Sequence, residues 1–237
     1  IGSVVAATAQ LDNLTARLTI HVKYSLEATV QPNPNKDGVP VVTNADHIAV
    51  LVNKQRSLPD GFEPDNLVVP DVPFSFSSDH EKKYMQEPAA RALERLFAAA
   101  AADGIELNAV SGYRSFATQT AIFNWNLQNQ GEEHTLRYSA RPGTSEHQTG
   151  LAMDVSSPSV GNALEDVLGD VKEGQWLEEH CAEFGFIIRY PKGKEDITGY
   201  AYEPWHLRYV GETLAKAIMD NGLTMEEYFS DGIPVSN

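Results

Sequence analysis

An amphipathic helix beginning at Pro88 is the pattern that most constrains how this chain can fold. Leu93, Leu96, Phe97 and Ala100 recur at the i, i+3, i+4, i+7 spacing that places side chains on one buried helix face. Proline suits the first turn of a helix, and the glycine at position 104 suits the left-handed residue that ends one. The chain is therefore predicted to bury one face of this helix in a core.

Strand patterns are interspersed with helical ones over the rest of the chain. Short apolar or alternating runs predict strands at IELNAV (105–110), LAMDV (151–155), FIIRY (186–190) and WHLRYV (205–210). Another helix is predicted over about 175–184. Because helices and strands alternate along the chain, we predict an α+β fold.

One more helix is predicted to begin near Ser115. Its inner face would carry Phe116, Phe123 and Leu127, and a polar loop is expected from Gly131 onward. This helix begins within the SGYRSFATQ segment, so Arg114 lies just before it and Gln119 lies about one turn into it.

The N-terminal part differs in composition from the rest. Ile20, Val22 and Tyr24 alternate with polar residues, the period of a half-buried strand. The run QPNPNKDGVP that follows concentrates proline, asparagine and glycine, which favours an exposed linker or long turn. We therefore predict an N-terminal extension and linker over 1–47 and a single main domain over 48–237.

Charge and cysteine content exclude some classes of partner and structure. A net charge of -15, from 18 basic and 33 acidic side chains, argues against a nucleic-acid partner, which needs a clustered basic surface. Cys181 is the one cysteine, so no intramolecular disulfide is possible, and its apolar-periodic surroundings predict a buried thiol. The chain opens at Ile1 without methionine, so one expectation is a removed signal or membrane anchor upstream.

The segment SEHQTGLAMDV places a histidine and an aspartate where they can meet. Leu151, Met153 and Val155 share one face of the predicted strand, so Asp154 lies on the other face. His147 precedes the strand in a loop and could then approach Asp154.

The segment YEPWHLRYV supplies a second histidine and a glutamate. His206 and Arg208 share the face of the strand opposite to its apolar residues. Pro204 removes a ladder hydrogen bond, and the resulting bend could turn Glu203 toward the same point as His206 despite their odd spacing. Two neutral imidazoles and one carboxylate form a ligand set that binds zinc and leaves a position for water. A lone His or Asp in a strand is also common as a hydrogen-bonded core group, so the pattern alone leaves both interpretations open.

The chain also contains the segments SGYRSFATQ, LVNKQRSLP and FGFIIRYPKGKEDITGYAYEPWHLRYVG. Together with the two segments above, they resemble the VanY-type D-alanyl-D-alanine carboxypeptidases, which belong to the LAS metallopeptidases. The resemblance spans roughly residues 48 to 230 and does not extend to 1–47. It implies that the main domain is a zinc carboxypeptidase catalytic domain, in which helices flank a small antiparallel sheet that carries the zinc.

The resemblance also implies roles for individual residues. His147, Asp154 and His206 would bind zinc, Glu203 would be the catalytic base, and Arg114 would orient substrate and stabilise developing charge. Further substrate contacts would be Gln119, Ser145, Tyr190 and Trp205.

The resemblance implies a peptidoglycan stem peptide or precursor as the substrate. It also implies an extracellular location at the cell wall or membrane. The resemblance fits a D-Ala-D-Ala carboxypeptidase and also an L,D-carboxypeptidase that trims a tetrapeptide to a tripeptide. A dipeptidase or a phage-lysin type of endopeptidase fits less well. From another class, a wall-binding module with a structural zinc is the alternative, although structural sites normally have four protein ligands.

Overall fold

Four short strands form the antiparallel sheet on which the rest of the main domain is built. The computed structural model describes residues 4–11, 14–21, 29–33 and 38–229. The sheet has the order β7-β8-β10-β9, and its strands are β7 Asn108–Ser111, β8 Ala152–Ser156, β9 Phe186–Tyr190 and β10 Glu203–Tyr209. The predicted α+β fold with a small antiparallel sheet is therefore confirmed.

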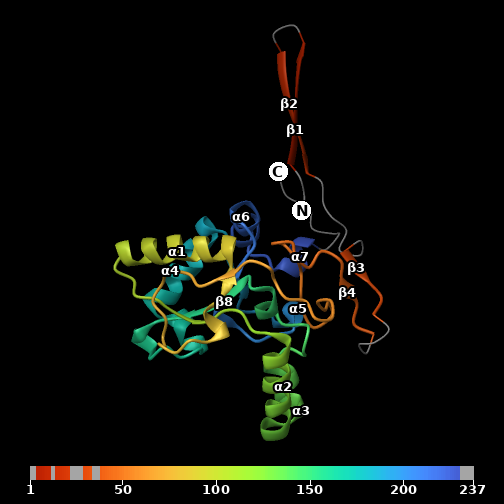
Figure 1. Cartoon of the computed structure of the whole chain (residues 1–237). Helices are drawn as coiled ribbons and strands as arrows, with labels where there is room; N and C mark the ends of the chain where they lie inside the picture. Colours follow the sequence, from red (N-terminus) through yellow and green to blue (C-terminus); the bar gives the residue numbers. More distant parts are fainter. Residues whose placement is uncertain (1–3, 12–13, 22–28, 34–37, 230–237) are drawn as a thin grey trace.

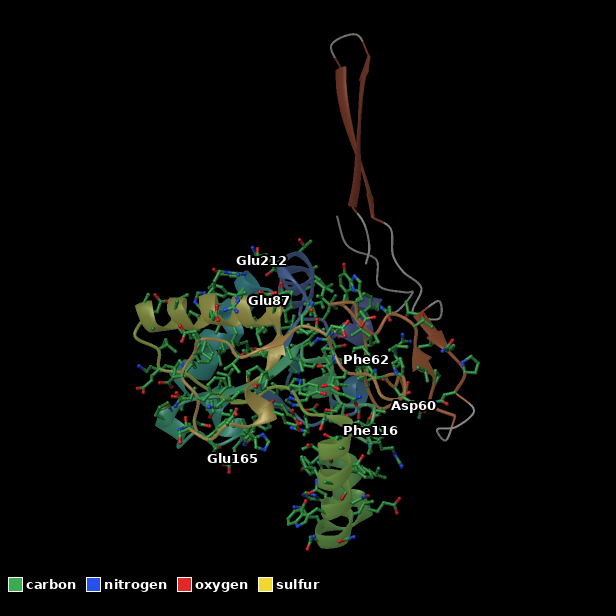
Figure 2. All side chains as sticks on the ribbon, in the orientation of Figure 1. Asp60, Phe62, Glu87, Phe116, Glu165 and Glu212 are labelled. Atoms are coloured by element: carbon green, nitrogen blue, oxygen red, sulfur yellow. The ribbon has the colours of Figure 1, made fainter. Side chains whose placement is uncertain are left out.

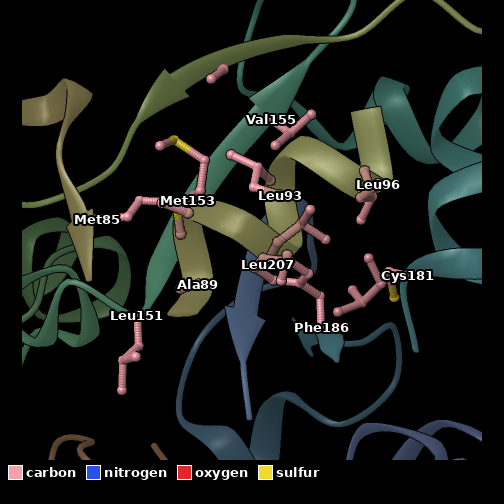
Figure 3. Close-up of a cluster of buried hydrophobic side chains, with 14 of the residues drawn as sticks. Met85, Ala89, Leu93, Leu96, Leu151, Met153, Val155, Cys181, Phe186 and Leu207 are labelled. Carbon is pink, nitrogen blue, oxygen red and sulfur yellow. The ribbon is translucent and has the colours of Figure 1, made fainter. Parts of the chain in front are cut away.

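The long helix α1 Glu87–Ala102 covers one face of this sheet. Figure 3 shows Leu93 and Leu96 of α1 facing Met153 of β8 and Leu207 of β10 in the main apolar cluster. The predicted face of α1 is buried, and Pro88 lies in its first turn. Because α1 and the apolar side chains of β8 and β10 fill this face, the polar side chains of the same strands point to the opposite face.

Three further helices complete the body around the sheet. They are α4 Lys172–His180, α6 Glu212–Met219 and α7 Met225–Phe229, and the short 3-10 helix Cys181–Phe184 continues α4. Ile187 of β9 packs with Ile218 and Met225 in a second, smaller apolar cluster. Cys181 is buried in the main cluster, as its sequence context predicted.

Helices α2 Phe116–Gln130 and α3 Glu132–Tyr138 project together from the body (Figure 1). Ser115 caps α2 by accepting a hydrogen bond from the backbone N–H of Thr118 at 3.2 Å. The predicted inner face of α2 is wrong at Phe116, which is 39% exposed where the helix leaves the body (Figure 2). The loop expected from Gly131 is also wrong, because this stretch forms α3 and lies against α2.

The N-terminal part contains two antiparallel pairs. β1 Val4–Leu11 pairs with β2 Leu14–His21, and β3 Val30–Gln31 pairs with β4 Val41–Val42. Ile20 lies in β2, whereas Val22 and Tyr24 lie outside the described residues. Val42 and Ala45 belong to the main apolar cluster, so the chain joins the body before residue 47. The domain boundary itself stays a prediction.

The remaining short elements connect these parts. In chain order they are β5 Leu67–Val68, the 3-10 helix Glu81–Lys83, β6 Met85–Gln86, the 3-10 helices Glu146–Thr149, Pro158–Val160 and Asp166–Asp170, and α5 Glu195–Thr198. Among the residues that the structure describes, no helix is long and apolar enough to cross a membrane.

Candidate metal centre and active site

Three buried side chains, His147, Asp154 and His206, converge on the face of the sheet opposite α1. One ligand atom from each lies within 4.8 Å of the others. His206 and Asp154 are direct partners in the register of β10 and β8, and this pairing brings their side chains to the same face. His147 reaches the same point from the 3-10 helix Glu146–Thr149. The three residues singled out in the sequence therefore lie together.

His147 is oriented by the backbone next to it. Its Nδ1 lies 2.8 Å from the carbonyl oxygen of Gly112, which can only accept a hydrogen bond. Nδ1 must therefore carry the hydrogen, and Nε2 faces Asp154 Oδ2 at 3.4 Å with its lone pair. Burial, together with the positive charges of Arg114 and His206, lowers the pKa of His147 to about 3. The ring is neutral at pH 7, as a metal ligand must be.

His206 presents Nδ1 to the cluster, whereas His147 presents Nε2. Nδ1 lies 3.1 Å from Asp154 Oδ1 and 3.8 Å from Glu203 Oε2, whereas Nε2 lies 3.2 Å from Glu146 Oε2. Burial opposes a charge on this ring, but the negative charges of Asp154 and Glu146 and the hydrogen bond to Glu146 raise its pKa to about 9. A cation held by Nδ1 would take the place of the second ring proton.

The donor set fits a zinc ion. Among the residues described, the buried Asp154 Oδ1 has no donor in hydrogen-bond geometry, even though His206 Nδ1 is only 3.1 Å away. A hydrogen bond needs the donor to point at the acceptor, and this carboxylate oxygen and imidazole nitrogen are close but not aligned in that way. Their arrangement fits better with two ligands that bind the same cation. Two imidazoles and one carboxylate are a ligand set of catalytic zinc sites.

Glu203 reaches the cluster because β10 is irregular at its start. Glu203 pairs with Tyr190 and Leu207 pairs with Ile188, so the β10 segment is longer than its β9 partner and contains a bulge-like register shift. The shift includes Pro204 and turns Glu203 to the same side as His206, three residues on. Burial raises the pKa of Glu203 to about 7. A carboxyl group titrating near neutral pH can both take and return a proton.

Arg114 approaches the cluster from the end of β7. Burial lowers the pKa of Arg114, while the negative charges of Asp154 and Glu203 act in the opposite direction. The guanidinium therefore interacts electrostatically with both carboxylates. Its Nη1 donates to Gln119 Oε1 at 2.9 Å, and the amide of Gln119 in turn donates to the carbonyl oxygen of Ala140 at 2.7 Å. Gln119 is fully buried and is engaged in holding Arg114.

The other residues predicted as substrate contacts lie on or next to the elements that carry the cluster. Tyr190 is buried, and its ring centroid lies 5.0 Å from that of His206 and 4.6 Å from that of Tyr200. Ser145 is buried immediately before the 3-10 helix that carries His147, and Trp205 is half-buried in β10. Their contact with substrate stays a prediction.

Glu146 and Arg189 are site residues that sequence reasoning missed. Glu146 accepts hydrogen bonds from Arg189 Nε at 2.8 Å and from Arg208 Nη1 at 2.7 Å. Burial alone would raise the pKa of Glu146, but the two arginines hold it well below the ordinary value. The signal available in the sequence was a charged residue inside each of two short apolar strands, since an arginine buried there requires a partner.

Known proteins resemble this chain in sequence and structure. The model of the VanY family, described as D-alanyl-D-alanine carboxypeptidase, matches residues 82–212. YodJ of Bacillus subtilis (strain 168) is 50% identical over 212 residues, which cover 89% of this chain and 78% of YodJ. A structure of the LdcB LD-carboxypeptidase has a TM-score of 0.82 at 49% identity and covers 87% of this chain and 96% of that one.

A second solved structure, a mutant of the vancomycin-resistance D,D-pentapeptidase VanY in complex with Zn(II), has a TM-score of 0.64 at 32% identity. The similarity covers 77% of this chain and 98% of that one.

Proposed function

The chain belongs to the VanY family of zinc-dependent D-alanyl-D-alanine carboxypeptidases, and on that premise we propose that it hydrolyses the last peptide bond of peptidoglycan stem peptides and releases D-alanine. The observation that carries this proposal is that Glu203 and Arg114 lie beside the three-residue ligand cluster. Glu203 Oε2 is 3.8 Å from His206 Nδ1, and the backbone N–H of Arg114 donates to the carbonyl oxygen of His147 at 3.2 Å. A wall-binding module with a structural zinc would need neither of these two groups and would normally close the site with a fourth ligand.

We propose that His147 Nε2, Asp154 and His206 Nδ1 hold the zinc, because these atoms face one another. When bound, zinc acts as a Lewis acid that polarises the scissile carbonyl group and makes water a stronger acid. The sheet fixes two of the ligands by strand pairing, and the hydrogen bond to Gly112 fixes the third. The ligands are therefore held in place by the fold itself.

Glu203 is proposed as the general base and acid. Its carboxylate takes the proton of the attacking water and then gives a proton to the nitrogen of the departing D-alanine. Its pKa of about 7 fits both transfers, because neither protonation state is strongly disfavoured near neutral pH.

Arg114 is proposed to stabilise the negative charge that develops on the carbonyl oxygen. A preorganised donor at such a position is typically worth about 3–4 kcal/mol in the transition state. Gln119 holds the guanidinium through its Oε1, so we propose that Gln119 acts on substrate through Arg114. Ser145, Tyr190 and Trp205 are proposed as contacts for the peptide and its terminal carboxylate.

Two substrates are candidates, and they differ in the residue before the scissile bond. A pentapeptide ending in D-Ala-D-Ala is the first candidate, supported by the description of the family. A tetrapeptide cleaved to a tripeptide is the second, supported by the higher similarity to the LdcB LD-carboxypeptidase than to the VanY D,D-pentapeptidase. Both substrates occur in the cell wall, so we propose that the protein acts outside the membrane.

The test is mass spectrometry of products after the zinc-loaded protein is incubated separately with the stem pentapeptide and the stem tetrapeptide. Each reaction is repeated with a chelator and with Glu203→Gln. Loss of one alanine from the pentapeptide alone supports D,D specificity, and loss from the tetrapeptide supports L,D specificity. If zinc is bound and neither peptide is cleaved, the carboxypeptidase proposal is refuted in favour of an endopeptidase or a binding module.

A further inference from the structure

Glu146 is a charged residue in the core of the molecule that the proposed chemistry does not use. It is 2% exposed, and both of its carboxylate oxygens are engaged. Oε1 accepts from Arg189 Nε at 2.8 Å and from Arg208 Nη1 at 2.7 Å, while Oε2 lies 3.2 Å from His206 Nε2. A buried carboxylate is costly to keep, so contacts this specific require an explanation.

The two arginines hold Glu146 at a fixed place. Arg189 also makes a two-pronged contact with Glu226 of α7, with Nη1 2.9 Å from Oε2 and Nη2 2.6 Å from Oε1. Arg208 Nη2 donates to the carbonyl oxygens of Ile48 at 3.0 Å and Val50 at 2.8 Å. Each arginine therefore binds Glu146 on one side and a separate segment of the fold on the other.

The formal charges in this network balance. Glu146 and Glu226 carry two negative charges, and Arg189 and Arg208 carry two positive charges. Because the charges cancel, Glu146 can stay ionised in the interior while its Oε2 remains directed at His206. An ionised carboxylate only accepts hydrogen bonds, so the nitrogen that faces it must carry a hydrogen.

We propose that Glu146 is a positioning residue that makes Nδ1 the metal-binding nitrogen of His206. With the hydrogen on Nε2, a neutral imidazole has its lone pair on Nδ1, and Nδ1 is the nitrogen that faces Asp154 at 3.1 Å. His147 shows the reverse arrangement, since the carbonyl oxygen of Gly112 holds its Nδ1–H and leaves Nε2 for the metal. The two histidines thus use opposite nitrogens, each selected by a different acceptor. This inference rests on the proposed role of His206 as a zinc ligand.

A purely structural role for the network makes a different prediction. If Glu146 only neutralised the two arginines, breaking either end of the network would cost stability and leave zinc affinity unchanged. Glu226 provides the matched control, because it also binds Arg189, while the other hydrogen bond that its carboxylate accepts among the described side chains comes from Asn53 and not from His206.

The experiment measures zinc affinity by competition with a chromophoric chelator, together with thermal unfolding, in the full chain. The variants are Glu146→Gln, Glu146→Asp and Glu226→Gln. In Glu146→Gln, the amide oxygen is drawn to the arginines, so the amide N–H is turned toward Nε2 and favours the wrong tautomer of His206. We expect a loss of zinc affinity of about 10–100-fold, the usual effect of losing such a partner. Glu146→Asp, which keeps an acceptor, should lose less.

Glu226→Gln should lower the unfolding temperature and change zinc affinity by less than about 3-fold. An equal loss of affinity in Glu226→Gln and Glu146→Gln, or no loss in either, would overturn the positioning role. His206→Ala is measured alongside, because unchanged zinc affinity in that variant would reject the ligand assignment itself.

A measurement on the unaltered protein covers the case in which Glu146→Gln fails to fold. Long-range nitrogen–proton NMR correlations of the zinc-loaded protein report which ring nitrogen of each histidine carries hydrogen. The proposal expects hydrogen on Nε2 of His206 and on Nδ1 of His147. Hydrogen on Nδ1 of His206 would overturn it.

Discussion

His206 and Asp154 lie directly opposite each other in the register of β10 and β8, with His206 Nδ1 3.1 Å from Asp154 Oδ1. The proposed zinc site is thus built on paired strands, which move less than loops do. His147, the third member, is tied to the end of β7 through Gly112. The site therefore depends on the sheet for its geometry.

Removing one ligand should release the metal. We expect His206→Ala to lower zinc affinity by more than the roughly 10–100-fold that loss of an outer hydrogen-bond partner costs. Elemental analysis of the purified protein after dialysis is the measurement. His180→Ala is the control, since His180 lies on α4 and pairs with Glu183. Full zinc occupancy in His206→Ala would refute the ligand assignment.

Glu203→Gln should keep zinc and lose turnover. The amide has nearly the shape of the carboxylate but cannot take a proton, so kcat should fall by about 10²–10⁴-fold, the typical contribution of a general acid–base group. Elemental analysis and a D-alanine release assay are run together. Glu212→Gln, at an exposed position at the start of α6, is the control. Activity equal to that of the unaltered protein would remove Glu203 from this role.

Gly174→Ala should destabilise the protein, although the same change in a helix usually stabilises it by about 1 kcal/mol. A Cβ at position 174 would lie 1.9 Å from the carbonyl oxygen of Leu168, so the backbone must shift. We expect a loss of about 1–3 kcal/mol, typical of overpacking. That corresponds to about 2–4 °C in Tm for each kcal/mol in a chain of this size. Gln175→Ala, at an exposed position in the same helix, should leave Tm unchanged within about 1 °C.

The Cys181 thiol should be unreactive in the folded protein. Burial raises its pKa to about 12, so the thiolate that reacts with alkylating reagents is scarce at pH 8. Mass spectrometry after treatment with iodoacetamide at pH 8 should find no adduct, and the same treatment in denaturant should give one. Rapid labelling under native conditions would contradict the buried position.

The local elements of the fold followed from the sequence. The spacing of Leu93, Leu96 and Ala100 identified α1 and its buried face, and FIIRY matched β9. Period-two alternation also placed Asp154 and His206 on the polar face of the sheet. These predictions succeed because the direction of a side chain within a helix or strand depends only on its position along that element.

Longer-range relationships were decided by the tertiary structure. Glu203 and His206 have a spacing that would send them to opposite faces of a regular strand, and the register shift against β9 reunites them. Phe116 fits an apolar face by spacing, but α2 leaves the body there and exposes it.

Glu146 is the clearest case of a contact that only the tertiary structure decided. Its partners Arg189 and Arg208 lie 43 and 62 residues away in the sequence. Local periodicity carries no information about which distant segments meet, because that choice depends on how the whole core packs. The sequence by itself determined α1, the strands β8, β9 and β10 and the direction of the ligand side chains, and the packed fold determined which charges these side chains meet.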